Sequence, residues 1–283
     1  MYENVSIILK KGYKTWQKNL NISIPILLQN IVSIILLFSV IGFLMLKISK
    51  ILPKDPDDII YVLTTDSTLL YTITHKIVIT FFVFLIISSV VNAFFSAGAI
   101  GMAKTATIGN NTKIQEMIGY GKKFYSRTLT ANLIINVIEF AGIVFLIPGY
   151  LKIADDQLKG LSCLITGFLA WGFYIMIMNI IFVVVKYAII IEDISTIAGI
   201  KKSIQFFLSH LFDVIIVYML MSIILIIINL ISMPFSFYSH LELIGTMVYL
   251  VFTVIAVTIT TIWWTRLYMD RTKRKFSERI EGK

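Results

Sequence analysis

The chain has 283 residues, of which 58% are hydrophobic and only 14% are charged, and its formal net charge is +9. Soluble domains carry about 25% charged residues, so this composition excludes an ordinary soluble globular protein. The single cysteine, Cys163, excludes an intrachain disulfide and a metal cluster built from cysteines.

Three short amphipathic segments are predicted to be helices at the membrane surface. In residues 1–20 the apolar side chains share one helical face, while the lysines lie largely elsewhere. Such a helix lies in the headgroup plane or packs beneath a membrane bundle. Thr112 and Gln115 have the spacing of a capping box and predict that the second helix starts there. The third is predicted to begin near residues 192–195.

Six apolar stretches are long enough to cross a bilayer, which takes about 20 residues in a helix. We expect helices because a helix satisfies its own backbone hydrogen bonds in lipid. The predicted spans are Ile22–Leu46, Ile77–Ile100, Leu129–Leu151, Leu161–Val185, Phe212–Met233 and Leu243–Trp264.

One amphipathic helix followed by two spans recurs three times along the chain. Segment 12–20 matches segment 121–129 on the pattern G-x-K-x-aromatic-x-basic-polar-Leu, and 203–211 is a weaker third copy. Because each unit starts on the same side, the repeats are parallel, and their natural symmetry axis runs along the membrane normal. The alternative is duplication without spatial symmetry. The predicted fold class is therefore all-α, a polytopic membrane helix bundle of three amphipathic-helix-plus-hairpin repeats.

We predict a single integral membrane domain. It covers residues 1–283, with repeat units at about 1–103, 110–189 and 195–268 and a basic cytoplasmic tail at 269–283.

The positive charges are distributed unequally between the two sides of the membrane. With the N-terminus inside, 19 of the 25 Lys and Arg residues lie on the inner side and 6 on the outer side. The positive-inside rule then predicts a cell-membrane protein with both termini in the cytoplasm. The same asymmetry explains the net charge through topology and anionic lipid, so we expect no nucleic acid partner.

A polar centre within the membrane is the first candidate site. Glu139 lies near the middle of the third span, where a charged side chain is costly and usually faces the bundle interior. Asn30 occupies the matching position of the first unit. With Asn92, Asn136 and Asn179, these residues either form an ion or proton site or provide hydrogen bonds between helices.

Interfacial residues are the second candidate site, and they contact lipid or a partner. The residues Trp16, Tyr125, Phe207, Lys122, Lys123 and Arg127 lie in the three matched segments. Aromatic residues favour the membrane interface, so anchoring is the alternative to a specific lipid site.

Catalytic and cofactor motifs are absent from the sequence. The three histidines fit no metal-ligand spacing, and no P-loop, H-E-x-x-H or G-x-S-x-G occurs. We therefore expect no enzyme activity, no cofactor and no metal. An intramembrane enzyme that acts on lipid ranks last among the functions, because no nucleophile–base pair is visible.

Two stretches carry a resemblance to a known family. They are GYGKKFYSRTLTANLIINVIEFAGIVFLIPGY and FVVVKYAIIIEDISTIAGIKKSIQFFLSH, in which Glu192-Asp193 precedes Lys202-Ser203. The chain resembles the six-span prokaryotic membrane domain that also precedes some glycerophosphodiester phosphodiesterases, and related uncharacterised membrane proteins. The resemblance implies a multi-pass membrane protein, and the soluble phosphodiesterase barrel with its metal-binding acids is missing.

The leading functional prediction is a non-enzymatic membrane scaffold or accessory subunit. Its cytoplasmic helices would contact lipid headgroups or a protein partner, and its oligomeric state is left open. The alternative is a small-solute transporter or channel with a polar centre near Glu139.

Overall fold

The computed structural model describes residues 2–50, 67–153, 157–237 and 242–272, and all regular structure in these ranges is helical. The chain divides into two compact units. We call Leu27–Asn92 the hairpin unit, and Met1–Ile26 with Ala93–Lys283 the main unit. This grouping does not test the single domain or its three repeat units, which stay predictions.

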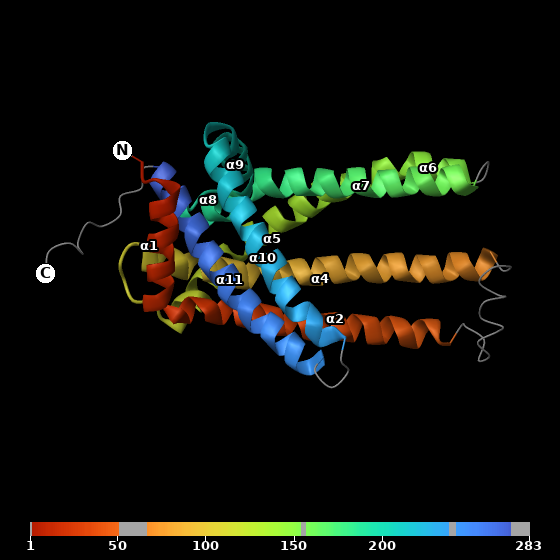
Figure 1. The fold of residues 1–283 in the computed structure, drawn as a ribbon, viewed down its shortest axis with the longest axis horizontal. Helices are drawn as coiled ribbons and strands as arrows, with labels where there is room; N and C mark the ends of the chain where they lie inside the picture. Colours follow the sequence, from red (N-terminus) through yellow and green to blue (C-terminus); the bar gives the residue numbers. More distant parts are fainter. Residues whose placement is uncertain (1, 51–66, 154–156, 238–241, 273–283) are drawn as a thin grey trace, which may run out of the picture. The chain divides into compact units, whose positions relative to one another are not determined.

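Helices occur at every predicted span (Figure 1). Among the described residues, six helical stretches are long and apolar enough to cross a membrane. This indicates a multi-pass membrane protein in contact with a lipid bilayer. The helices are α1 (Val5–Lys18), α2 (Ser23–Ile48), α4 (Ser67–Thr107), α5 (Ile114–Phe140), α6 (Ile147–Ile153), α7 (Gln157–Phe182), α8 (Val185–Glu192), α9 (Thr196–Ser209), α10 (Leu211–Ser236) and α11 (Glu242–Arg271), with 3-10 turns η1 (Leu20–Ile22) and η2 (Ala141–Leu146).

The core of the main unit is built around the short helix α8. Val185, Ala188, Ile189 and Ile190 are fully buried there and pack with side chains of α1, α5, α9 and α11. Long spans such as α10 instead expose large apolar residues, as expected where lipid replaces water. The best-packed part of the main unit therefore lies where several short elements converge.

Close helix contacts depend on glycine. A Cβ on Gly149 of α6 would come within 2.5 Å of the backbone nitrogen of Leu164 in α7. A Cβ on Gly167 of α7 would come within 2.3 Å of the Phe145 carbonyl oxygen. Backbone atoms cannot swing aside, so only glycine permits α6 and α7 to approach this closely.

A helix begins near Thr112, as predicted, but the predicted capping box does not form. Helix α5 begins at Ile114 after the N-cap residue Lys113, whose side chain makes no capping bond. The backbone N–H of Thr112 instead donates to the side-chain oxygen of Asn19, 3.1 Å away. A long-range contact with the end of α1 has replaced the local cap.

The second predicted surface helix is not separate from its span. Helix α5 continues without a break from Ile114 to Phe140, whereas α1 and α9 each end before the next span begins. The start of α9 follows the sequence-based expectation, because Ser195 is its N-cap and accepts a hydrogen bond from the Ala198 amide at 3.4 Å.

Two spans change their backbone hydrogen bonding. The third gives way to η2 directly after Phe140, and the fourth is interrupted by a turn at residues 183–184, between α7 and α8.

Candidate functional site: the polar end of the main unit

Charged residues from six helices and the N-terminal residues gather at one end of the main unit. We call this cluster the polar end, and it comprises Glu3, Lys11, Lys104, Lys123, Arg127, Glu192, Asp193, Asp213, Arg266, Asp270 and Arg271. The start of α10 and the end of α11 meet here because Arg271 pairs with Asp213.

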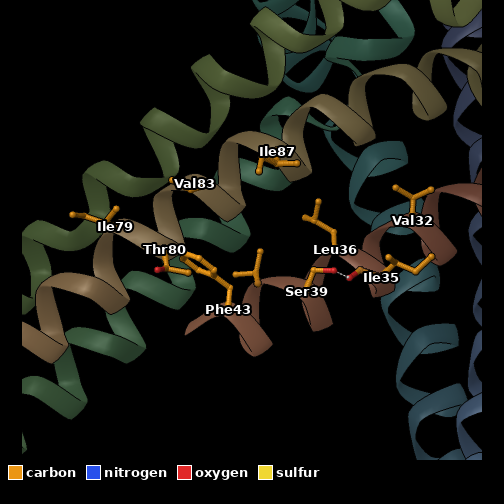
Figure 2. A pocket seen from close by; sticks show the side chains of 10 residues that line it. Val32, Ile35, Leu36, Ser39, Phe43, Ile79, Thr80, Val83 and Ile87 are labelled. Carbon is orange, nitrogen blue, oxygen red and sulfur yellow. Dashed lines mark hydrogen bonds between the residues drawn. The ribbon is translucent and has the colours of Figure 1, made fainter. Parts of the chain in front are cut away.

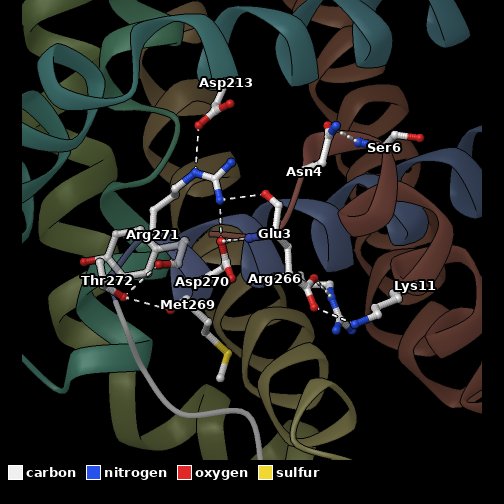
Figure 3. A network of polar contacts seen from close by, with 11 residues as sticks. Glu3, Asn4, Ser6, Lys11, Asp213, Arg266, Met269, Asp270, Arg271 and Thr272 are labelled. Atoms are coloured by element: carbon white, nitrogen blue, oxygen red, sulfur yellow. Dashed lines mark hydrogen bonds and ion pairs between the residues drawn. The ribbon is translucent and has the colours of Figure 1, made fainter. Parts of the chain in front are cut away.

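Arg271 is the centre of one half of the polar end (Figure 3). Its guanidinium donates to Asp213 at 2.7 Å, to the carbonyl oxygen of Glu3 at 2.9 Å and to the carboxylate of Asp270. The Arg271 side chain is only 6% exposed, so these acceptors replace the water that a buried charge would otherwise need. This arginine therefore joins the N-terminus to the last two spans.

Glu3 joins the same network to α1 and α11. Its carboxylate lies 2.6 Å from Nζ of Lys11 and 3.3 Å from Nε of Arg266. Burial raises the pKa of Glu3, but hydrogen bonds from Lys11 and Arg266 outweigh it and hold the pKa below its ordinary value. Glu3 is therefore ionised at neutral pH.

His210 lies between α9 and α10, beside the ring of Phe206 at 5.1 Å between centroids. Burial and then the charge of Arg271 hold the pKa of His210 below its ordinary value, although Asp213 and Asp270 act in the opposite direction. The imidazole is therefore neutral at neutral pH and packs as an aromatic ring.

The other half of the polar end forms around the C-terminus of α8. Asp193 has a positive φ of 55° and ends the helix in the left-handed conformation. Its carboxylate lies 2.6 Å from both Lys123 and Arg127 of α5, and these hydrogen bonds hold the pKa of Asp193 below its ordinary value. Lys104 of α4 donates to the carbonyl oxygen of Ile191 at 3.0 Å, where a cation complements the helix dipole.

Three of the four residues of the resemblance have defined contacts here. Glu192 accepts a 2.6 Å hydrogen bond from the Tyr268 hydroxyl, and Asp193 pairs with α5. Ser203 is fully buried and donates to the Ile181 carbonyl oxygen at 2.7 Å. Lys202 is only partly exposed. The acidic pair and the serine thus hold α8 and α9 against their neighbours.

The interfacial candidates divide by what they contact. Lys123 and Arg127 lie over the Phe124 ring as well as beside Asp193, whereas Lys122 is exposed. The three aromatic residues Trp16, Tyr125 and Phe207 are all partly buried. Trp16 donates to Ser23 at 3.2 Å, and Phe207 packs against the core.

The intramembrane candidates fall into different units. Asn30 and Asn92 belong to the hairpin unit, and Glu139, Asn136 and Asn179 to the main unit. Asn179 donates to the Ile175 carbonyl oxygen of its own helix at 3.0 Å. A single polar centre made from all five residues therefore stays a prediction.

Glu139 has a basic neighbour that sequence reasoning missed. Its carboxylate interacts electrostatically with Lys186 of α8, which follows directly after the predicted fourth span Leu161–Val185. The only sequence signal was a lysine within an otherwise apolar run, FVVVKYAIII. The turn at residues 183–184 precedes this lysine.

At both helix interruptions near Glu139 and Lys186, side chains donate hydrogen bonds to backbone carbonyl oxygens. Trp171 donates its indole N–H to the Glu139 carbonyl oxygen at 3.0 Å, and the Tyr174 hydroxyl donates to the Ile138 carbonyl oxygen at 2.8 Å. At the other interruption, Ser203 supplies the bond to Ile181. Backbone groups freed within a membrane need such partners, so α7 and α9 stabilise the irregular backbone.

The hairpin unit contains an apolar groove of about 420 Å³ (Figure 2). Two of its ten lining residues are polar, Ser39 and Thr80. The Ser39 hydroxyl donates to the Ile35 carbonyl oxygen at 2.7 Å, within its own helix. The groove is therefore an apolar surface suited to acyl chains. Glu139 is not among the residues that line this groove.

No group of three or more potential metal-binding His, Cys, Asp or Glu residues occurs among the described residues. The absence of a metal and of a cofactor stays a prediction.

The chain belongs to the family described as "Domain of unknown function (DUF7847)", which matches residues 31–270. An uncharacterized protein of Archaeoglobus fulgidus is 26% identical over 294 residues, covering 96% of this chain and 97% of that protein. No solved structure matches the chain.

Proposed function

We propose that this member of the DUF7847 family is a non-enzymatic membrane scaffold or accessory subunit, with both termini in the cytoplasm. Exposed lysines of the helices that form its polar end would present a basic surface to anionic lipid headgroups or to an acidic surface of a protein partner. The resemblance to the membrane domain that precedes some glycerophosphodiester phosphodiesterases belongs to the same proposal, because that domain works beside a separate catalytic one.

The observation that supports this proposal is a division among the basic residues. Lys11, Lys123, Arg127, Arg266 and Arg271 are neutralised by carboxylates within the protein. A second set of lysines is exposed and makes no ion pair in the described part of the chain: Lys10, Lys14, Lys18, Lys113, Lys122 and Lys201. The first set makes the end rigid, and the second remains available to a membrane or partner.

Each exposed lysine near an anionic membrane contributes about 1 kcal/mol of attraction, so several act together. They lie on α1 and α9, on α5 and at its N-cap, so three helices contribute to the surface. Helix α1 keeps its place because it buries Ile8 and Gly12 against the main unit. A surface that is already ordered loses little conformational entropy when it binds.

The test compares two charge-neutralised forms of the full-length protein. In the first, Lys10, Lys14 and Lys18 are changed to Gln; in the matched control, Lys47, Lys76 and Lys152 are changed to Gln. Native mass spectrometry after extraction measures retained phosphatidylglycerol, and photo-crosslinking in intact membranes measures protein neighbours. We expect the first variant to lose lipid or a crosslinked neighbour that the control retains. If both variants retain every lipid and neighbour of the unchanged protein, the scaffold proposal is wrong.

Topology is tested separately with the single native cysteine removed by Cys163→Ala. A membrane-impermeant maleimide should label Lys152→Cys but not Lys14→Cys in intact cells. The reverse labelling pattern would place the polar end outside.

A small-solute transporter or channel is the second candidate, and the environment of Glu139 favours it. An acid and a base interact at a level where two spans lose regular helical bonding, and transporter sites are often formed by discontinuous helices. In proteoliposomes that show uptake, Glu139→Gln should abolish it, while Glu116→Gln should not. Unchanged uptake by Glu139→Gln would remove this site assignment.

A further inference from the structure

A second cleft lies between α10 and α11, at the opposite end of these helices from the polar end. Its volume is about 630 Å³, within the roughly 300–1,000 Å³ of small-molecule sites. Its lining residues are Ile226, Asn229, Leu230, Ser232, Met233, Glu242, Gly245, Thr246 and Tyr249. They lie toward the end of one candidate span and at the start of the next, so we expect Glu242 near the lipid headgroups and Ile226 among the acyl chains.

The cleft presents two kinds of surface. Ile226, Leu230 and Met233 provide an apolar wall on α10. The carboxylate of Glu242 lies at the first residue of α11 and forms no ion pair with any described residue. An amphiphile with an apolar body and a charged head matches this combination.

Three polar side chains of the cleft already donate hydrogen bonds within their own helices. The Asn229 amide donates to the Leu225 carbonyl oxygen at 2.9 Å, the Ser232 hydroxyl to the Asn229 carbonyl oxygen at 3.0 Å, and the Thr246 hydroxyl to the Glu242 carbonyl oxygen at 2.9 Å. A hydroxyl has one hydrogen, so Ser232 and Thr246 offer only lone pairs to a ligand. Asn229 keeps its side-chain oxygen as an acceptor, and one N–H of its amide besides the one that donates to Leu225.

The charge and the hydrogen-bonding capacity therefore select the same chemistry. A carboxylate favours a cation, and a lining rich in acceptors favours a cation that donates several hydrogen bonds. A primary ammonium group has three N–H donors, whereas a trimethylammonium group has the same charge and none. The Tyr249 ring adds a surface that attracts cations of either type.

We propose that this cleft binds a membrane lipid whose headgroup carries a primary ammonium group. The ammonium would lie against Glu242 and the oxygens of Asn229 and Thr246, and an acyl chain would lie along Ile226 and Leu230. Helices α10 and α11 approach closely beside the cleft, because a Cβ on Gly245 would come within 2.5 Å of the Phe235 Cβ. The bound lipid would therefore be held from the open side of the α10–α11 pair.

The test uses two lipids that differ only in methylation of the headgroup nitrogen. Full-length protein in detergent is offered equimolar dioleoylphosphatidylethanolamine and dioleoylphosphatidylcholine, and native mass spectrometry measures the ratio retained. We expect the unchanged protein to prefer phosphatidylethanolamine about tenfold, the usual scale of a charge-assisted hydrogen bond. Glu242→Gln should bring the ratio close to one, while the control Glu116→Gln, outside the cleft, should keep the preference.

Asn229→Leu provides a second variant that removes an acceptor without changing the charge, and it should lower the ratio by a smaller factor. A ratio near one in the unchanged protein, or an unchanged ratio in both cleft variants, would overturn the proposal. Decylammonium tests the source of the amine. Displacement of phosphatidylethanolamine by it supports a shared site, whereas binding of decylammonium without phosphatidylethanolamine would overturn the assignment to a lipid.

Discussion

Segments 12–20 and 121–129 share a sequence pattern, yet one ends a helix and the other continues it. Helix α1 ends at Lys18, and Asn19 leaves the helical region with φ −135° and ψ 59°. Helix α5 passes through the equivalent residue, Thr128, and continues to Phe140. The third segment behaves as the first does, because His210 ends α9 with φ −133° and ψ 37°.

The contacts of the residue at the eighth position of each segment explain why one helix ends there and the other continues. The Thr128 hydroxyl is buried and is shared between the carbonyl oxygens of Phe124, 2.9 Å away in its own helix, and Ala93, 3.1 Å away in α4. Asn19 instead donates to the Thr15 carbonyl oxygen and accepts from the Thr112 amide. A hydroxyl that bonds within its own helix is compatible with continuation, whereas an Asn side chain can cap a helix end.

We expect the largest change in the free energy of unfolding from substitution of the small residue at the start of a segment. A Cβ on Gly12 would come within 2.5 Å of Trp263, whose indole is held by a 3.0 Å hydrogen bond to Leu9. A Cβ on Gly121 would come within 2.8 Å of the outer edge of the Phe94 ring, which can shift. Overpacking costs about 1–3 kcal/mol, and the Gly-to-Ala gain in helix propensity offsets about 1 kcal/mol.

We therefore expect Gly12→Ala to lower the free energy of unfolding by about 2 kcal/mol and Gly121→Ala to leave it almost unchanged. Circular dichroism during titration with sodium dodecyl sulfate measures both. Equal losses in the two variants would contradict this account of the contacts.

Ser203 occupies the same first position in the third segment, but it acts through a hydrogen bond. Ser203→Ala leaves the Ile181 carbonyl oxygen without its 2.7 Å donor, so we expect a loss of about 1–2 kcal/mol in the free energy of unfolding. Ser126→Ala, at an exposed position of the second segment, is the control and should change nothing measurable. A loss no larger than that of the control would mean that the bond contributes nothing to stability.

Asn19→Ala tests the end of α1. Removing the side chain takes away its bond to Thr15 and the acceptor of the Thr112 amide, and we expect a loss of about 1 kcal/mol. Hydrogen exchange at the Thr112 amide should accelerate, while it should not in the exposed control variant Asn111→Ala. Unchanged protection of that amide would show that the contact between α1 and α5 is not formed.

We expect the smallest effect on stability from the pH-dependent pairing of Asp193 with Lys123 and Arg127 of the second segment. Hydrogen bonds from Lys123 and Arg127 hold the pKa of Asp193 below the ordinary 3.8, so its contribution to stability is complete above that pH. The contribution is lost as the pH falls through the lower pKa of the folded state. Because Asp193 is exposed, Asp193→Asn should differ only slightly from the unchanged protein at pH 7, and the difference should disappear in acid. A difference that grows on acidification would contradict this sign.

Part of the candidate site was visible in the sequence, and part was not. Lys123 and Arg127 stood out through their register, and the start of α9 was expected near residues 192–195. The pairing with Asp193 was not predictable, since 66 residues separate it from Arg127. The proximity of Lys186 to Glu139 was missed for the same reason.

The sequence by itself determined the six apolar spans, because the length and hydropathy needed to cross a bilayer are local properties. It also marked the segments where short helices meet those spans. Only the tertiary structure decided which segment ends its helix, where two spans break and which charges pair. Each of these outcomes depends on a donor or acceptor from another helix, and helix periodicity contains no information about which helix supplies it.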